Sequence, residues 1–194
     1  MDQARTPLLL INDVARRNFL RGTATLSAAT IALLSGRHAL AARACPEKGD
    51  AASDIRILNT ALAAEHEAIA AYQVGAESGL LSPQALALAT QFQGHHKAHA
   101  ELLASTVTRL GGKPNETLRR YEFPTEGLKM EADVLRFAAG LERGAVSAYL
   151  GAVPLFGNPD LAKAAASILG DEAMHWAVLR QVLGDEPVPV AFVS

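Results

Sequence analysis

The sequence predicts an all-α protein built from four long helices, and three observations support that prediction. The chain is rich in Ala and Leu, has only 5% aromatic residues and contains few β-branched runs, which favours helices over strands. Four long stretches carry apolar residues at alternating steps of four and three, the spacing that places side chains on one face of a helix. Gly and Pro residues separate these stretches. The chain of 194 residues is long enough for one domain with a sizeable core.

The first 44 residues are predicted to be an export signal rather than part of the fold. They contain an arginine pair, a weakly apolar run of small residues and two small-x-small cleavage candidates, in that order: Arg16-Arg17, residues 22–36, 39–41 and 42–44. This order resembles a twin-arginine translocation signal. The alternatives are a helix of the folded domain or a membrane anchor, but residues 22–34 are too few and too polar to span a bilayer comfortably.

The resemblance implies that the twin-arginine translocation machinery exports the folded chain to the periplasm, often with a cofactor already bound. A polar linker, residues 45–52, would then begin the mature protein. Six of the 18 basic residues and two of the 20 acidic ones precede Cys45, so the mature chain has a net charge of −6. This charge argues against nucleic acid and anionic membrane surfaces as partners, and no stable membrane span is expected. Cys45 is the only cysteine. Lipid anchoring through it is the alternative, although residues 42–44 form a poor lipobox.

Capping and stop residues delimit the first two helices. Ser53 or Asp54 caps a helix expected to run to about Ser78, because Gly79 supplies a left-handed stop. Ser82-Pro83 begins the second helix, which runs to about residue 110 and ends at two glycines. The residues expected to face inward are Leu58, Leu62, Glu65, Ile69 and Tyr72 in the first helix, and Leu88, Phe92, His96, His99, Leu103, Val107 and Leu110 in the second.

The second and third helices are joined by a polar connection without helical period, residues 111–129. Roughly 19 residues at up to ~3.3 Å each can run the length of a bundle. The chain can therefore return to the end where the second helix began. The third helix is expected from about Glu131 to Val153, where Pro154 breaks it. Its inward residues are Leu135, Ala138, Glu142, Val146, Tyr149 and Val153.

The fourth helix is capped by Asn158-Pro159 and stops at Gly184, and an extended tail, residues 185–194, is expected to lie along the bundle. Its inward residues are Leu161, Ala165, Ile168, Glu172, His175, Leu179 and Val182. A carboxylate and an imidazole thus stand in the middle of an apolar seam. Burying them costs several kcal/mol unless other groups or an ion satisfy them.

The two helix pairs repeat one another. A Glu seven residues before a Tyr recurs at a displacement of 77, and an ionisable residue three before a His recurs at a displacement of 76. The related pairs are Glu65 and Glu142, Tyr72 and Tyr149, His96 and Glu172, and His99 and His175. All of them lie on the predicted inward faces, so acids and imidazoles from four helices are expected at one level of the core.

This pattern resembles the ferritin-like superfamily of four-helix bundles, in which two antiparallel helix hairpins are joined by a long crossover. The resemblance covers residues 53–184, and the run ILGDEAMHWAVLR is most similar to exported ferritin-like proteins. In that family one Glu from each of two helices and a Glu-x-x-His from each of the other two surround two metal ions. The matching residues are Glu65 and Glu142 as single carboxylates, Glu172 and His175 as the Glu-x-x-His of the last helix, and His99 as the His of the second.

The departure from the family pattern is His96, which stands where the family has a metal-bridging Glu. An imidazole has one lone pair per nitrogen and does not ordinarily bridge two ions. A mononuclear site or a site with two different metals is therefore an alternative to a dinuclear one. The predicted ligands are Glu65, His96, His99, Glu142, Glu172 and His175, for one or two ions of Fe or Mn, with Zn also compatible.

Five neighbours of these residues carry separate expectations. His66, Glu67 and His95 are expected to be solvated, although a small rotation of the second helix would exchange His95 for His96. Tyr72 and Tyr149 are expected to donate hydrogen bonds beside the ligands, because buried Tyr hydroxyls usually find a partner.

Two functions remain open. The first is redox chemistry with O2 or peroxide at an iron or manganese site, as the resemblance implies. The second is a metal-free exported bundle, structural or stress-related, whose acids and imidazoles neutralise one another. Ferritin-type storage is a third interpretation, and a homo-oligomer is open, since one chain does not show a cage-forming surface. The chain contains no phosphate-binding Gly loop, Cys-x-x-Cys pair, His-Glu-x-x-His run or nucleophile elbow.

Overall fold

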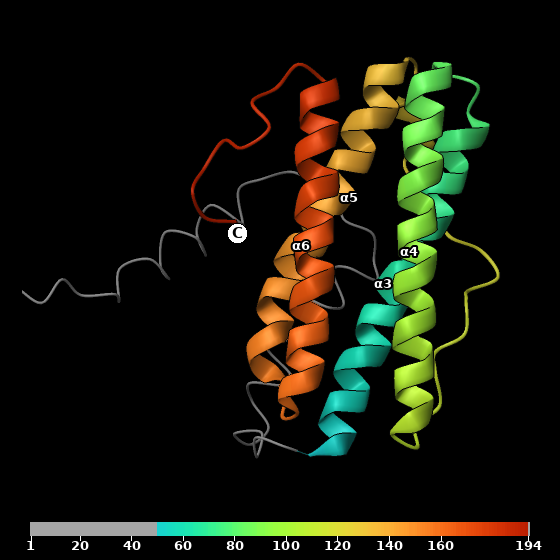
Figure 1. Cartoon of the computed structure of the whole chain (residues 1–194). Helices are drawn as coiled ribbons and strands as arrows, with labels where there is room; N and C mark the ends of the chain where they lie inside the picture. The colour runs from blue at the N-terminus through green and yellow to red at the C-terminus, as the bar shows by residue number, and fades with distance from the viewer. Residues whose placement is uncertain (1–49, 194) are drawn as a thin grey trace, which may run out of the picture.

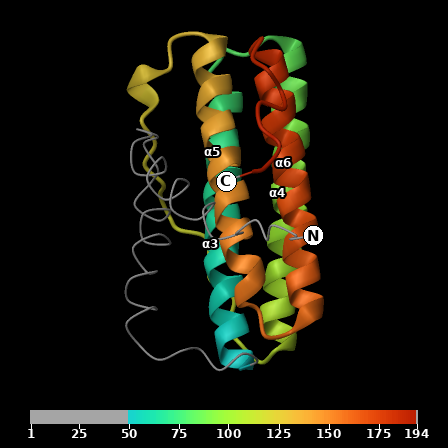
Figure 2. The same cartoon turned by 90° about the vertical axis from the view of Figure 1, so that its left-hand side faces the viewer.

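The computed structural model describes residues 50–193, so the predicted signal segment at 1–44 and most of the predicted linker lie outside the described residues. Within residues 50–193 there are four long helices, two short 3₁₀ turns and no strand. The helices are α3 (Ala51–Glu77), α4 (Pro83–Arg109), α5 (Glu131–Ala152) and α6 (Pro159–Val182). They run side by side along one axis (Figure 1), and the view turned by 90° shows the same bundle (Figure 2). The all-α four-helix prediction is confirmed.

The four helices form two antiparallel hairpins, α3–α4 and α5–α6, and α3 also packs against α5. The connection between the hairpins runs back along the outside of the bundle (Figure 1). Near its start, the backbone N–H of Asn115 donates to Asn59 Oδ1 of α3 over 2.7 Å. At its end, Glu131 accepts a hydrogen bond from the backbone N–H of Ser82, so α5 begins beside the start of α4. The long crossover expected from the sequence is therefore present.

The helix boundaries follow the predicted caps with one exception. Ser82 and Asn158 cap α4 and α6 as expected, since their side chains accept hydrogen bonds from the first turn. The cap of α3 is Asp50, not Ser53 or Asp54. Asp54 is instead buried, and it accepts hydrogen bonds from the backbone N–H groups of Gly157 at 2.8 Å and Asn158 at 3.1 Å. It thereby ties the start of α3 to the turn between α5 and α6.

The apolar core consists of two clusters on either side of a polar layer. One cluster packs Leu58, Leu62, Ala100, Leu103, Val107, Tyr149, Phe156, Leu161, Ala165 and Ile168. The other packs Tyr72, Ala85, Phe92, Leu135, Ala138, Ala139 and Leu179. These are largely the residues that the helical spacing placed inward. The clusters hold the four helices in register and enclose the polar residues at mid-height.

The C-terminal tail differs from its expected packing. It loops away from the end of α6 (Figure 1), and its apolar side chains stay in solvent, with Val188 69% and Phe192 79% exposed. Its start is held to α6 by two hydrogen bonds, from Arg180 Nε to the carbonyl of Glu186 at 2.6 Å and from the backbone N–H of Asp185 to the carbonyl of Arg180 at 2.9 Å. The rest of the tail leaves the bundle instead of lying along it as expected. Among residues 50–193, no helix has both the length and the apolar character needed to cross a membrane.

Candidate metal centre

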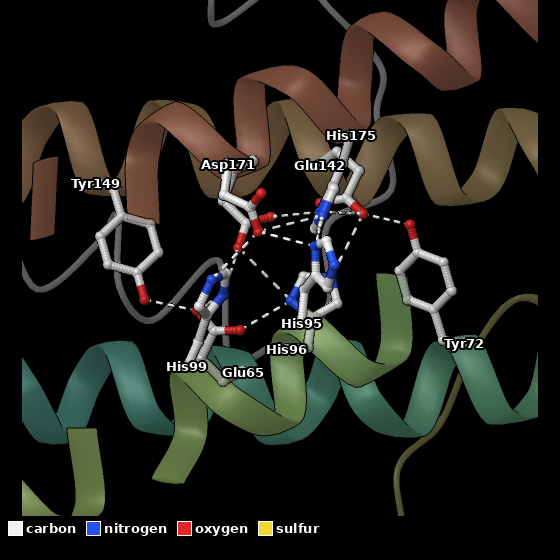
Figure 3. A network of polar contacts seen from close by, with 10 residues as sticks. Glu65, Tyr72, His95, His96, His99, Glu142, Tyr149, Asp171 and His175 are labelled. Atoms are coloured by element: carbon white, nitrogen blue, oxygen red, sulfur yellow. Dashed lines mark hydrogen bonds and ion pairs between the residues drawn. The ribbon is translucent and has the colours of Figure 1, made fainter. Parts of the chain in front are cut away.

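All six predicted ligands meet in the polar layer between the two apolar clusters. Figure 3 labels five of them, Glu65, His96, His99, Glu142 and His175. They come from all four helices: Glu65 from α3, His96 and His99 from α4, Glu142 from α5, and Glu172 and His175 from α6. The predicted convergence is confirmed, and five of the six residues are at most 3% exposed. Their role as metal ligands stays a prediction.

The six residues form two overlapping sets whose donor atoms lie within 4.8 Å of one another. One set is Glu65, His96, His99 and Glu172, and the other is His96, Glu142, Glu172 and His175. The two sets share His96 and Glu172, which occupy equivalent positions in the two hairpins. The sets are therefore the two halves of one centre, and the shared residues lie between them.

Two tyrosines support the single carboxylates, and they do so across the hairpins. Tyr149 of α5 donates a hydrogen bond to Glu65 Oε1 of α3 over 2.6 Å. Tyr72 of α3 donates in the same way to Glu142 Oε1 of α5. Burial and the neighbouring carboxylates raise the pKa of both hydroxyls, which therefore remain protonated donors at neutral pH. The expected hydrogen bonds are present, and they tie α3 to α5.

His96 lies between the two single carboxylates. Its Nδ1 is 2.8 Å from Glu65 Oε2, and its Nε2 is 3.3 Å from Glu142 Oε1. Burial acts to lower the pKa of His96, but its hydrogen bonds to Glu142 and Glu65 outweigh that effect and raise the pKa to about 11. Burial opposes ionisation of the two carboxyls in turn, yet hydrogen bonds to the imidazoles lower the pKa of both. In the metal-free protein the ring is thus a cation shared by two carboxylates.

His99 and His175 are oriented alike, each with one nitrogen inward and one toward Asp171. His99 Nδ1 is 3.1 Å from Glu172 Oε1, and His175 Nδ1 is 3.5 Å from Glu142 Oε1. The Nε2 atom of each ring lies 3.3 Å from Asp171 Oδ2. A carboxylate on the outer nitrogen is the usual partner of a metal-binding imidazole, since it fixes the ring and its tautomer.

Both imidazoles also have a raised pKa. Burial acts to lower the pKa of His99, but the nearby carboxylates of Glu172 and Glu65 outweigh it and raise the pKa to about 9. Burial likewise acts on His175, and the nearby carboxylates of Glu142 and Glu172 raise its pKa to about 9. At neutral pH the metal-free centre therefore pairs its carboxylates with protonated imidazoles.

Asp171 and His95 belong to the site although the sequence did not single them out as ligands. His95 Nδ1 is 2.8 Å from His175 Nε2 and 3.1 Å from Asp171 Oδ2. Their side chains are the more exposed parts of the network, at 39% for His95 and 23% for Asp171. They mark the side where the centre approaches solvent. The signals in the sequence were position alone: Asp171 precedes Glu172, and His95 precedes His96.

One expectation about solvated residues is wrong, because Glu67 is buried with 5% exposure. The His95 side chain is 39% exposed, although it also contacts the network. Phe92 covers one face of the His175 ring, because the two rings stack with their centroids 4.0 Å apart.

Several buried polar atoms of the centre have no hydrogen-bond partner within the described part of the chain. They are His99 Nδ1, Glu142 Oε2, both carboxylate oxygens of Glu172 and His175 Nδ1. Each such atom costs about 1–3 kcal/mol if left unsatisfied. All of them face the interior of the centre, and a mixture of imidazole and carboxylate donors suits Fe(II), Mn(II) or Zn(II). The residues present therefore fit a divalent cation.

Comparisons with known proteins are consistent with the fold. A sequence model described as the ferritin-like domain matches residues 53–185, which spans all four helices. The comparison with curated proteins gave no match.

Solved structures of three bacterial proteins resemble this one. A conserved hypothetical protein from Mycobacterium tuberculosis is 24% identical with a TM-score of 0.63, over 73% of this chain and 97% of that one. The dodecameric thioferritin from Bacteroides fragilis, a bacterioferritin-related protein, is 25% identical with a TM-score of 0.59, over 71% and 88%. A ferritin-like diiron-carboxylate protein from Bacillus anthracis is 22% identical with a TM-score of 0.59, over 69% and 96%. These likenesses support the arrangement of the four helices.

Proposed function

Because the chain belongs to the ferritin-like domain family, we propose that it is a metal-binding protein whose polar layer holds one or two divalent ions. Iron and manganese are the proposed metals, and zinc is compatible with the same donors. The observation that carries the proposal is Glu172, which is 0% exposed and has both carboxylate oxygens without a hydrogen-bond partner. The nearest nitrogens, His99 Nδ1 at 3.1 Å and His175 Nδ1 at 3.5 Å, form no well-aligned hydrogen bond with it, and a metal ion bound by the carboxylate and both imidazoles would satisfy all three groups.

The proposed chemistry is redox exchange with O2 or peroxide. A bound iron or manganese ion would supply the electrons, and the Bacillus anthracis relative is itself described as a diiron-carboxylate protein. The chain's own residues would hold the ion, while Phe92 and the apolar clusters exclude bulk water. The half-exposed pair of His95 and Asp171 would leave one side open to a small molecule.

One observation favours a metal-free alternative. Without a metal, His96, His99 and His175 are protonated at neutral pH, so three imidazolium groups balance the charge of Glu65, Glu142 and Glu172. Under this alternative the protein would be a structural or stress-related bundle of the cell envelope. The unpaired oxygens of Glu172 argue against it, because none of the three imidazoles forms a well-aligned hydrogen bond with either oxygen.

Metal analysis of the purified full chain tests the proposal. We expect stoichiometric iron, manganese or zinc in the wild type and its loss in Glu172→Ala, because Glu172 belongs to both donor sets. Glu101→Ala, at an exposed position of α4, is the matched control and should keep the metal. A metal-free wild type whose melting temperature does not rise on adding any of the three metals would support the alternative.

Export is a separate proposal that depends on residues 1–44. We propose that the twin-arginine translocation machinery carries the folded chain to the periplasm, with a lipid anchor at Cys45 as the alternative. Replacing Arg16 and Arg17 by Lys should keep the protein in the cytoplasm when cell fractions are compared. The mass of the mature protein would show whether Cys45 carries a lipid.

Self-association is proposed from one relative. The Bacteroides fragilis thioferritin is dodecameric, and a homo-oligomer of this chain would be a related assembly. Light scattering on the purified protein gives its mass directly. A monomer at all concentrations would contradict this proposal and leave the metal centre unaffected.

A further inference from the structure

The two single carboxylates of the centre are not in the same state. Both oxygens of Glu65 are engaged, Oε1 by the Tyr149 hydroxyl at 2.6 Å and Oε2 by His96 Nδ1 at 2.8 Å. Glu142 uses only Oε1, which receives the Tyr72 hydroxyl, while its Oε2 is buried without a partner. One carboxylate is therefore closed by hydrogen bonds, and the other has an oxygen free for a cation.

The orientation of His96 distinguishes the halves further. Its Nδ1 lies 2.8 Å from Glu65 and its Nε2 lies 3.3 Å from Glu142, so a neutral, metal-binding ring that keeps the shorter contact keeps its proton on Nδ1. In the neutral ring the lone pair then lies on Nε2, which faces Glu142. A carboxylate on one imidazole nitrogen and a metal on the other is a recurrent arrangement in metalloproteins. Glu65 therefore orients His96 toward the half that contains Glu142.

The same half contains most of the other unpaired donors, whereas the half of Glu65 adds only His99 Nδ1 to the shared Glu172. Glu172 has two free oxygens, and His175 directs a free Nδ1 inward at 3.5 Å from both Glu142 Oε1 and Glu172 Oε2. The outer nitrogen of His175 lies 3.3 Å from the carboxylate of Asp171. Each imidazole of this half thus has a carboxylate on its other nitrogen, Glu65 for His96 and Asp171 for His175. All four donor residues of this half are buried.

We propose that the centre binds a single divalent cation, held by His96, Glu142, Glu172 and His175, and that Glu65 positions His96 instead of binding the ion. This inference rests on the proposed metal-binding function. A second ion beside Glu65 and His99 could bind His96 only by taking Nδ1 from its hydrogen bond with Glu65, and the two ions would then share one imidazole through both nitrogens. Without His96, that ion would have three donor residues, Glu65, His99 and Glu172, and Glu65 would have to exchange a hydrogen bond for it.

The test is the number of ions bound by the full chain after removal of metal and reloading with Zn(II) or Mn(II), read by elemental analysis and native mass spectrometry. We expect one ion in the wild type. His96→Glu restores a carboxylate at the shared position and should raise the number to two. A melting curve of this variant with and without metal shows whether it is folded.

The internal repeat offers a matched pair of variants for the same measurement. Glu142→Gln should abolish stoichiometric binding, because it removes a ligand. Glu65→Gln, at the equivalent position of the other hairpin, should still bind one ion. Its affinity should be about 10–100-fold weaker, the usual effect of removing a residue that hydrogen-bonds a metal ligand. Loss of the ion in Glu65→Gln and its retention in Glu142→Gln would overturn the assignment.

The other outcomes separate this inference from the proposed function. Two ions in the wild type would overturn the single-ion inference and leave metal binding intact. No ion with iron, manganese or zinc would overturn both. One ion that disappears in His95→Ala but persists in Glu142→Gln would place the metal at His95 and Asp171, which also overturns the inference.

Discussion

Glu65 and Glu142 occupy equivalent positions in the two hairpins, yet their surroundings differ. Each accepts a hydrogen bond from the tyrosine of the other hairpin and each is buried. Only Glu65 is fully paired, because His96 Nδ1 occupies its second oxygen. Equivalent residues in a repeated sequence therefore need not share a role, since their state depends on the group between them.

The difference arises at one pair of equivalent positions, His96 and Glu172. An ionised carboxylate only accepts hydrogen bonds, and it can direct one oxygen to each half of the centre. The neutral imidazole that binds a metal has one donor and one acceptor nitrogen, so it can donate to only one carboxylate, and the shorter contact of His96 is with Glu65. His96 thus turns a symmetric arrangement into one closed half and one open half. The following predictions test this comparison.

The largest expected effect is that of removing His96 itself. His96→Leu leaves the Glu65 and Glu142 carboxylates buried without their shared imidazole, which should lower the free energy of unfolding of the metal-free protein by about 3–5 kcal/mol. Urea unfolding in the presence of a chelator measures it. His99→Leu is the control, because the His99 side chain is 13% exposed and should cost less. A loss below about 1 kcal/mol for His96→Leu would mean that the two carboxylates are not charged.

The stability of the metal-free protein and its affinity for metal should change with pH in opposite directions. In the metal-free protein the stabilisation by His99 and His175 is complete below their unfolded pKa of 6.5 and is lost as pH rises through their folded pKa of about 9. The melting temperature should therefore fall between pH 6.5 and 9. Metal affinity should rise over the same range, because protons compete for the imidazoles.

Melting curves with chelator and binding titrations with Zn(II) check the two signs. A metal-free melting temperature that rises from pH 6.5 to 9 would contradict the pairing of protonated imidazoles with the glutamates. A metal affinity independent of pH in that range would show that no imidazole binds the ion.

The two tyrosines should separate stability from metal affinity. Tyr72→Phe and Tyr149→Phe each remove a hydrogen bond to a buried carboxylate and should each cost about 1–3 kcal/mol of stability. Only Tyr72→Phe touches a proposed ligand, Glu142, so it alone should weaken metal affinity, by about 10-fold. Competition titrations against a metal chelator measure both. Equal losses of affinity in the two variants would mean that the two halves bind metal alike.

The smallest effect is expected at the exposed side of the centre. His95→Ala removes a contact to the outer nitrogen of His175 and should change metal affinity by less than about 10-fold without changing the number of ions. Gln91→Ala, at an exposed position of the same helix, is the control. An equal effect of the two variants would show that the His95 contact does not influence the open half.

The fold was largely predictable because its signals are local. The steps of four and three, the caps at Ser82 and Asn158 and the glycine stops are read within one helix at a time. The start of α3 was not predictable from local signals. Asp54 accepts a hydrogen bond from the backbone N–H of Gly157, 103 residues further along the chain, and Asp50 caps the helix in its place. The prediction that residues 185–194 lie along the bundle was wrong, because the composition of the tail does not indicate whether it packs against the helices.

The site was predictable as a set of residues but not as a network. The inward faces placed Glu65, Glu142 and their partners at one level. Which nitrogen of His96 meets which carboxylate depends on ring orientation, and no spacing encodes it. Asp171 was missed because it lies beside the inward face, and only its contacts with two imidazoles reveal its role.

The most direct test of the open half is anomalous X-ray scattering from crystals of the protein grown with excess Mn(II) or Zn(II). We predict one peak in the core, within bonding distance of His96, Glu142, Glu172 and His175 and outside bonding distance of Glu65. A second peak beside Glu65 and His99, or a core without any peak, would contradict the account.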